Sequence, residues 1–203
     1  MSMKRVSLLF VVNLLLFTSS FSQVAYKIDD GSVMTITGTS TIHDWTSKVN
    51  EIKGEYILKE AIVNKKIPQS GSILEKVKVV VPVLSIESPR GTIMDKKTYN
   101  ALRFEQYPNL VFEAKTDNIE NITDKATEKF LLKVTGDLTL AGYTKEIILS
   151  VEGQKLASGK FEFKGSYPID MVEYNIEPPT AMFGQIITGK DVTIDFDLIL
   201  NRQ

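Results

Sequence analysis

His43 is the residue best suited to acid–base chemistry, and it is the only histidine in the 203 residues. It lies in the stretch Ile42-His43-Asp44-Trp45, beside a carboxylate and two residues before the only tryptophan. A histidine next to an aspartate could act as a general base with its orienting partner. On a strand, however, neighbouring side chains point to opposite faces, so His43 and Trp45 share a face that Asp44 does not. We therefore interpret His43 and Trp45 as packing at a strand end, with ligand contact at a cavity mouth and catalysis as alternatives.

The rest of the sequence offers little other chemistry. It contains no cysteine, no second histidine for a metal pair, no G-x-S-x-G turn and no glycine-rich phosphate loop. The 24 basic and 25 acidic side chains leave no basic excess to attract nucleic acid. The sequence therefore predicts a protein that is not an enzyme, has no catalytic residues, no metal and no cofactor, and does not bind nucleic acid.

The N-terminal residues are typical of a secretory signal. Lys4 and Arg5 precede an apolar run over residues 6–17, and Ser20 and Ser22 are small residues suited to cleavage before Gln23. We expect residues 1–22 to be a signal peptide, with an uncleaved anchor as the alternative. Residues 23–203 then form a single domain without a transmembrane segment, periplasmic or extracellular in location.

Most of the chain after Gly31 alternates between apolar and polar residues with period two, which predicts one-sided antiparallel strands. The apolar sets are Val77, Val79, Val81, Val83; Leu110, Phe112, Ala114; Phe130, Leu132, Val134, Leu138, Leu140; Ile147, Leu149, Val151; Phe161, Phe163; and Val192, Ile194, Phe196, Leu198, Leu200. Turn signals lie at residues 68–71, 141–142, 153 and 158–159. The pattern predicts an all-β fold of about eight strands, as a sandwich or a closed barrel that leaves no exposed edges.

Two segments depart from this alternation. Residues 88–108 place Met94, Thr98, Ala101 and Leu102 at helical spacing, which predicts a short helical insertion. Residues 117–129 are polar without a clear period, so we expect an exposed loop there.

Several segments together are similar to one known family. They are "IHDW" after a first strand, "YPNLVFEA", "GDLTLAGYTKEIIL" and a glycine-containing turn into "DVTIDFDLIL". Over roughly residues 26–200 the chain resembles the YceI-like family of secreted polyisoprenoid-binding proteins. The resemblance implies an extended, lipocalin-like antiparallel β-barrel whose apolar interior holds a long isoprenoid chain.

The resemblance also implies where a ligand would be bound. The inward aromatic residues Phe112, Phe130, Phe161, Phe163 and Phe196 would form the walls, although inward aromatics also fill cores. Arg90 and Arg103 flank the helical insertion and could bind a head group, or could be ordinary solvated charges. Met182 and Phe183 offer an apolar rim, or a loop that plugs one end of the barrel. The remaining expected ligand contacts are His43, Trp45, Met94, Leu102 and Phe104.

The leading hypothesis is binding, storage or transport of a long-chain isoprenoid lipid, of the polyprenyl phosphate or isoprenoid quinone type. One alternative is a secreted structural or partner-binding β-domain whose core is filled and which takes no ligand. Another is an enzyme that uses His43 on a bound hydrophobic substrate. The sequence leaves the oligomeric state open, with a homodimer among the expected forms.

Overall fold

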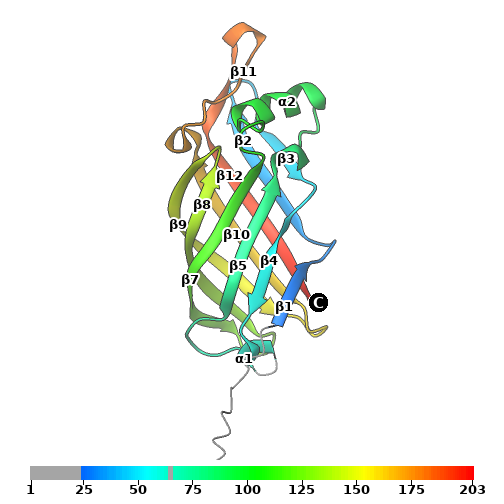
Figure 1. Cartoon of the computed structure of the whole chain (residues 1–203), viewed down its shortest axis with the longest axis vertical. Helices are drawn as coiled ribbons and strands as arrows, with labels where there is room; N and C mark the ends of the chain where they lie inside the picture. Colours follow the sequence, from blue (N-terminus) through cyan, green and yellow to red (C-terminus); the bar gives the residue numbers. More distant parts are fainter. Residues whose placement is uncertain (1–23, 64–65) are drawn as a thin grey trace, which may run out of the picture.

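Eight antiparallel strands form a closed ring in the computed structural model, which describes residues 24–63 and 66–203 (Figure 1). The ring runs β1-β4-β5-β7-β8-β9-β10-β12, and β12 pairs with β1 to close it. The strands are β1 (Val24–Ile28), β4 (Lys53–Leu58), β5 (Leu74–Pro82), β7 (Asn109–Asp124), β8 (Lys129–Leu140), β9 (Tyr143–Lys155), β10 (Phe161–Asp170) and β12 (Ile186–Arg202). The predicted barrel of about eight strands is confirmed. The signal peptide predicted over residues 1–22 lies outside the described residues.

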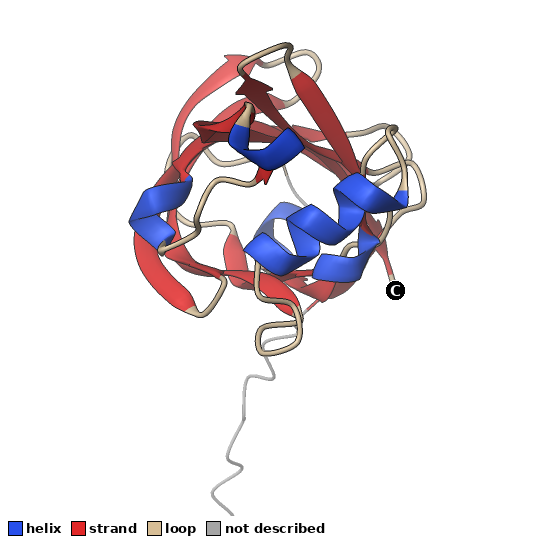
Figure 2. Cartoon of the chain, turned by 90° about the horizontal axis from the view of Figure 1, so that it is seen from above, coloured by secondary structure: helices blue, strands red, loops and turns tan. Residues whose placement is uncertain are grey.

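The two ends of the barrel differ. At the upper end in Figure 1 the sheet continues from β12 into β2 (Val33–Ser40), β3 (Trp45–Val49) and β6 (Ile86–Glu87), and β11 (Thr180–Ala181) pairs with β12. Helix α2 (Thr92–Ala101) also lies there, as the helical spacing predicted. Seen along the barrel, the strands form a ring and helical segments lie across part of it (Figure 2). The short helix α1 (Glu60–Val63) lies at the lower end.

The inward face of the barrel is apolar because the period-two pattern places every second side chain inside. In β8, Phe130, Leu132, Val134, Leu138 and Leu140 are all buried, as the alternation predicted. Burial of such side chains contributes about 25 cal/mol per Å² of apolar surface removed from water. The β8–β9 hairpin turns at Ala141 and Gly142, whose φ values of 48° and 84° fit the type I′ turn that suits twisted strands.

Four inward aromatic rings lie against glycines on neighbouring strands. A Cβ atom built on each glycine would come within 2.7 Å of the ring, so only glycine allows this contact. The pairs are Gly38 with Trp45, Gly136 with Phe112, Gly153 with Phe130 and Gly165 with Phe196. These glycines let the rings pack closely against the barrel wall.

Two local predictions were wrong. Residues 117–129 are not an exposed loop, because β7 continues to Asp124 and β8 begins at Lys129. Three irregularities in the β7–β8 register interrupt the side-chain alternation there. The sequence therefore lacks the period-two pattern from which a strand is predicted. Gly153 is not at a turn either, since it lies within β9 beneath the Phe130 ring.

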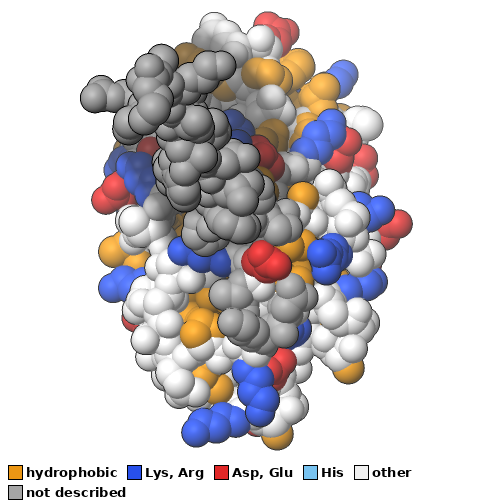
Figure 3. Space-filling model, turned by 60° about the horizontal axis from the view of Figure 1, so that its bottom comes forward, with side chains coloured by type: hydrophobic (Ala, Val, Ile, Leu, Met, Phe, Trp, Pro, Cys, Tyr) orange, Lys and Arg blue, Asp and Glu red, His pale blue; other side chains and the backbone are white. Residues whose placement is uncertain are grey.

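The outer face of the barrel carries cross-strand ion pairs. Lys115 of β7 contacts Asp137 at 2.7 Å and Glu146 at 3.0 Å, on the two following strands. Lys and Arg side chains are interspersed with Asp and Glu over the described surface visible in Figure 3. The barrel thus carries charged side chains on its outer face and an apolar inner face.

Short 3₁₀ segments complete the upper end. They are η1 (Val83–Ser85), η2 (Met171–Tyr174) and η3 (Met182–Gly184). η1 connects β5 to β6, η2 follows β10, and η3 lies between β11 and β12.

Candidate functional site

The middle of the barrel holds a cavity of about 140 Å³, the lower cavity. Every side chain that lines it is aliphatic, methionine or aromatic, and the aromatic ones are Tyr56, Phe112, Phe163, Tyr167 and Phe196. Apolar cavities of about this size stay dry and take up small hydrocarbons such as benzene. The lower cavity is therefore suited to a hydrocarbon chain.

The two tyrosines do not bring charge into the lower cavity. Burial raises the pKa of the Tyr56 phenol well above its ordinary value, and its hydroxyl donates to the Lys53 carbonyl at 3.1 Å. Burial also raises the pKa of Tyr167. Both rings thus contact the cavity in their neutral form.

An aromatic cluster closes the barrel below this cavity. The rings of Phe161 and Phe163 are stacked with centroids 6.3 Å apart, and Tyr26 and Phe130 each contact this pair edge-on. Tyr26, Phe130 and Phe161 are almost completely buried. Below them, the Lys155 amine of β9 donates to the carbonyls of Ile62 and Val63 in α1. A chain in the lower cavity therefore cannot leave through the lower end without displacing these groups.

A second cavity of about 210 Å³, the upper cavity, lies above the first. Ile36, Leu110, Leu140 and Ile194 line both cavities, so the two are adjacent along the barrel axis. The upper cavity has mixed chemistry: it is lined by apolar groups such as Trp45 and also by serines, threonines, His43, Arg90 and Lys97. Ile42 and Arg90 in this lining are exposed, so the upper cavity reaches the surface.

The structure brings eight of the expected contact residues to these cavities. Phe112, Phe163 and Phe196 line the lower cavity, whereas His43, Trp45, Arg90, Met94 and Leu102 line the upper one. They come from strands that are far apart in the sequence, and from α2 and the segments that flank it.

His43 and Trp45 are held by backbone contacts. His43 Nδ1 is 2.8 Å from the Asp44 carbonyl oxygen, which can only accept, so this nitrogen carries the hydrogen. Trp45 Nε1 donates to the Thr39 carbonyl at 2.9 Å. The imidazole is thus bonded to the Asp44 main chain and not to its carboxylate, which leaves no oriented His–carboxylate pair at this position.

Arg103 lies outside both cavities. Its guanidinium donates to the Ala141 carbonyl at 2.6 Å and lies 5.4 Å and 5.2 Å from the ring centroids of Tyr107 and Tyr143. It therefore ties the end of α2 to the β8–β9 hairpin. Phe104 also lies outside the cavities and contacts the Tyr99 ring edge-on.

The other expected contacts also lie elsewhere. Phe130 and Phe161 belong to the aromatic cluster at the lower end, where they fill the core. Met182 and Phe183 project into solvent from the loop that carries η3, and Phe183 is fully exposed. Both have left-handed φ values near 50°, which is uncommon for bulky residues. Their neighbours Pro179, Thr180 and Ala181 line the upper cavity instead.

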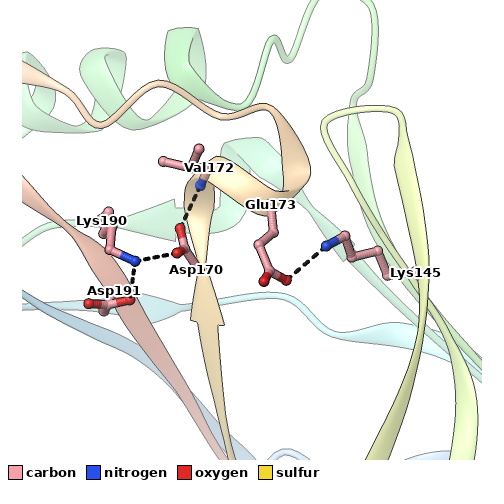
Figure 4. A network of polar contacts seen from close by, with 6 residues as sticks. All are labelled: Lys145, Asp170, Val172, Glu173, Lys190 and Asp191. Carbon is pink, nitrogen blue, oxygen red and sulfur yellow. Dashed lines mark hydrogen bonds and ion pairs between the residues drawn. The ribbon is translucent and has the colours of Figure 1, made fainter.

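A network of ion pairs fixes η2 (Figure 4), and Met171 of η2 lines the upper cavity. Lys190 of β12 donates to the Asp170 carboxylate, which also accepts the Val172 N–H at 2.9 Å. Lys145 of β9 contacts Glu173 of η2 at 2.8 Å. These contacts hold the segment that brings Met171 to the upper cavity.

Sequence reasoning missed some of the lining. Ser47, Met171 and Ile176 line the upper cavity, and Tyr56 lines the lower one. The position of Ser47 could have been predicted, because it is two residues after Trp45 on a strand and so shares its face. Met171 and Ile176 follow the end of β10, in a segment without the period-two pattern.

Within residues 24–63 and 66–203, no helix has the length and apolarity needed to cross a membrane. The same residues contain no group of three or more histidine, cysteine or acidic side chains placed to hold a metal ion.

Comparison with known proteins agrees with this geometry. A model of the YceI-like domain matches residues 19–200. A solved polyisoprenoid binding domain from Saccharophagus degradans, implicated in plant cell wall breakdown, has a TM-score of 0.67 at 15% identity, over 89% of this chain and 99% of that chain. BcnA from Burkholderia cenocepacia has a TM-score of 0.62 at 16% identity, over 85% and 98%. The YCEI protein of Campylobacter jejuni has a TM-score of 0.55 at 16% identity, over 77% and 84%. At these identities the structures show a shared fold, and no curated protein is significantly similar in sequence.

Proposed function

This chain belongs to the YceI-like domain family, and we propose that it binds the long chain of an isoprenoid lipid inside its barrel, without catalysing a reaction. The observation that carries the proposal is the pair of adjacent cavities. The lower cavity is lined by apolar side chains and is closed at its lower end, whereas the upper cavity is lined by both apolar and polar side chains and is open to the surface. The solved Saccharophagus degradans domain of the same fold, named for polyisoprenoid binding, supports the class of ligand. The cavities favour this function over a β-domain with a filled core.

The energetics of such binding are those of hydrocarbon burial. Each buried CH₂ group contributes about 0.8 kcal/mol, so ten of them supply roughly 8 kcal/mol before ordering costs are subtracted. The apolar lining of the two adjacent cavities together provides for this gain, and no strong polar motif is needed. The lipid would enter through the upper end, because the aromatic cluster closes the lower one.

A cavity-filling variant tests the proposal. Val77 lines the lower cavity, whereas the neighbouring Lys76 is exposed on the outer face. We expect Val77→Trp to occupy the space of several chain carbons and to lower the affinity for a long isoprenoid at least about tenfold. Lys76→Trp adds the same side chain outside and should leave binding unchanged.

The measurement combines titration with organic extraction of the purified protein and mass spectrometry of the extract. Circular dichroism checks that both variants remain folded. Equal lipid content in wild type and folded Val77→Trp would contradict binding inside the barrel.

We also propose that the protein is secreted to the periplasm or beyond, from the signal-like sequence of residues 1–22. The intact mass of the exported protein should then correspond to a chain that begins at Gln23. An exported chain that retains residues 1–22 would favour the uncleaved anchor.

A further inference from the structure

The loop that carries η3 lies at the top of Figure 1, at the open end of the barrel. Residues 178–189 contain no charged side chain, although none of them is buried. Phe183 is fully exposed, and 63% of the Met182 surface is exposed beside it. Large apolar side chains that are exposed together are typical of a binding surface. This loop is therefore a candidate for contact with a partner.

The backbone of the loop is unfavourable for the residues that it carries. Met182 and Phe183 have φ values of 51° and 56°, a left-handed conformation that is uncommon for bulky side chains. Gly184 follows with a φ of 86°. Such strain is often found at functional sites, and here it coincides with two exposed apolar side chains. A partner that covers both side chains would offset these costs.

The exposed apolar surface continues from this loop to the mouth of the upper cavity. Residues 179–181, directly before Met182, line the upper cavity. After the loop, the Ile187 carbonyl accepts the Thr41 N–H at 3.0 Å, and the Ile187 N–H donates to the Thr41 hydroxyl at 3.3 Å. These bonds bring Ile42, which lines the upper cavity, next to this segment. The exposed fractions of Ile42 and Ile187 are 60% and 49%.

The surface formed by Ile42, Met182, Phe183 and Ile187, the apolar patch, thus borders the entrance proposed for the lipid. A chain with ten CH₂ groups prefers an apolar phase to water by roughly a millionfold. A bilayer that covers the apolar patch would supply such a chain directly at the entrance. A second copy of the protein could also cover the apolar patch, but it would obstruct the entrance. The position of the apolar patch therefore favours a bilayer.

The charges at this end of the barrel are compatible with a membrane surface. Arg90 at the cavity mouth and Lys96 of α2 are exposed, and Asp95, the acidic residue of α2, is buried. Asp44 and Glu177 are exposed on neighbouring segments. Because the two signs nearly balance, we expect apolar contact to provide most of the attraction and anionic lipids to add little.

We propose that the apolar patch docks on a phospholipid bilayer, and that the isoprenoid passes directly between the bilayer and the upper cavity. This inference rests on the proposed lipid-binding function and goes beyond it, because it assigns the surface through which the ligand is exchanged and the partner that this surface contacts.

Co-sedimentation with phosphatidylcholine vesicles tests the docking. Delipidated mature protein is compared with the double variant Met182→Asn, Phe183→Asn, because asparagine accepts a left-handed φ more readily than a bulky apolar residue. We expect the double variant to lose at least about tenfold in its partition coefficient onto vesicles, since two apolar side chains no longer enter the bilayer. Replacing about one fifth of the lipid by phosphatidylglycerol should change the wild-type coefficient less than about fivefold.

Ile148→Thr is the matched control. Ile148 has 56% of its surface exposed, but it lies midway along β9, opposite Thr135 of β8 and away from the open end. Threonine keeps the strand propensity, so this variant should stay folded and partition as the wild type does. Thermal unfolding checks both variants, and the double variant should melt no lower than the wild type.

A transfer assay measures what the docking does. Vesicles that contain geranylgeraniol are mixed with delipidated protein, and the lipid bound to the protein is followed with time. We expect transfer to the double variant to be at least about fivefold slower, in line with its weaker docking. Its equilibrium affinity for farnesol, supplied from a cyclodextrin complex without any bilayer, should stay within about twofold, because neither Met182 nor Phe183 lines a cavity.

The outcomes separate this inference from the function on which it rests. Equal partition of wild type and folded double variant, or a folded wild type that binds neither kind of vesicle, would overturn membrane docking and leave lipid binding in place. A dimeric wild type and a monomeric double variant in sedimentation velocity would also overturn it, because a second copy would then cover the apolar patch. A wild type that partitions onto vesicles but takes up neither farnesol nor geranylgeraniol would overturn the lipid-binding function and the exchange of lipid with it.

Discussion

At the scale of single residues, Arg103 is the clearest case of a side chain whose structural role can be separated from ligand binding. Its guanidinium lies between the rings of Tyr107 and Tyr143 and donates to the Ala141 carbonyl. A lysine has no planar group to place between two rings. We expect Arg103→Lys to lower the free energy of unfolding by about 1–2 kcal/mol, measured by urea denaturation, and to leave isoprenoid affinity within about twofold.

Arg90→Lys is the matched control, because Arg90 is exposed at the cavity mouth and makes no ring contact among the described residues. Its effect on stability should stay below about 0.5 kcal/mol. A loss of lipid binding in Arg103→Lys with unchanged stability would instead support the head-group role that the sequence suggested for Arg103.

The residue scale also shows what sequence could indicate about the site. The alternation placed Phe112, Phe163 and Phe196 on the inward face, where they line the lower cavity. It placed Phe130 and Phe161 on the same face, and they instead close the lower end. Periodicity fixes the face of a strand but not the height in the barrel, and whether an inward ring fills a core or lines a cavity depends on height.

At the scale of elements, regular strands were predictable and irregular ones were not. β8 and β12 follow the predicted alternation, and α2 follows the helical spacing of Met94 and Thr98. The second half of β7 was missed because its register irregularities interrupt the period. Glycine inside β9 suggested a turn, although a glycine within a strand also marks close approach of another group, here the Phe130 ring.

The Asp170 carboxylate, at the end of β10, contributes to holding η2 in place. The hydrogen bond from the Lys190 amine lowers the pKa of Asp170 below its ordinary value of 3.8. A carboxyl whose pKa is lower in the folded state stabilises the fold above the unfolded pKa, and this contribution is lost as the pH falls through the folded pKa. We therefore expect the melting temperature to fall as the pH drops below about 4, and Asp170→Asn to reduce that dependence.

Thermal unfolding between pH 6 and pH 2.5 measures this effect. Asp191→Asn is the control, since Asp191 is more exposed and lies 3.6 Å from the same lysine. An Asp170→Asn variant whose melting temperature depends on pH as steeply as that of the wild type would show that this ion pair does not contribute.

At the scale of the whole molecule, the barrel is asymmetric along its axis. Three residue pairs between β1 and β12 close the ring near the lower end, where the aromatic cluster lies. Towards the upper end β2, β3 and β6 continue the sheet, and α2 and the loop before η3 border the upper cavity. This arrangement leaves the cavities open at the upper end. A chain bound in them would contact the folded state and not the unfolded one.

Binding to the folded state alone must raise stability. A ligand present at about 100 times its dissociation constant adds roughly 2.7 kcal/mol to the free energy of unfolding. For a domain of this size that corresponds to a rise in melting temperature of about 5–10 °C. We expect this rise when delipidated protein is saturated with a C20 isoprenoid, and at the same isoprenoid concentration we expect about half of it or less for Val77→Trp, whose affinity is at least about tenfold lower. A melting temperature that stays constant at saturating isoprenoid would mean that the folded barrel gains nothing from the lipid, because no chain enters it.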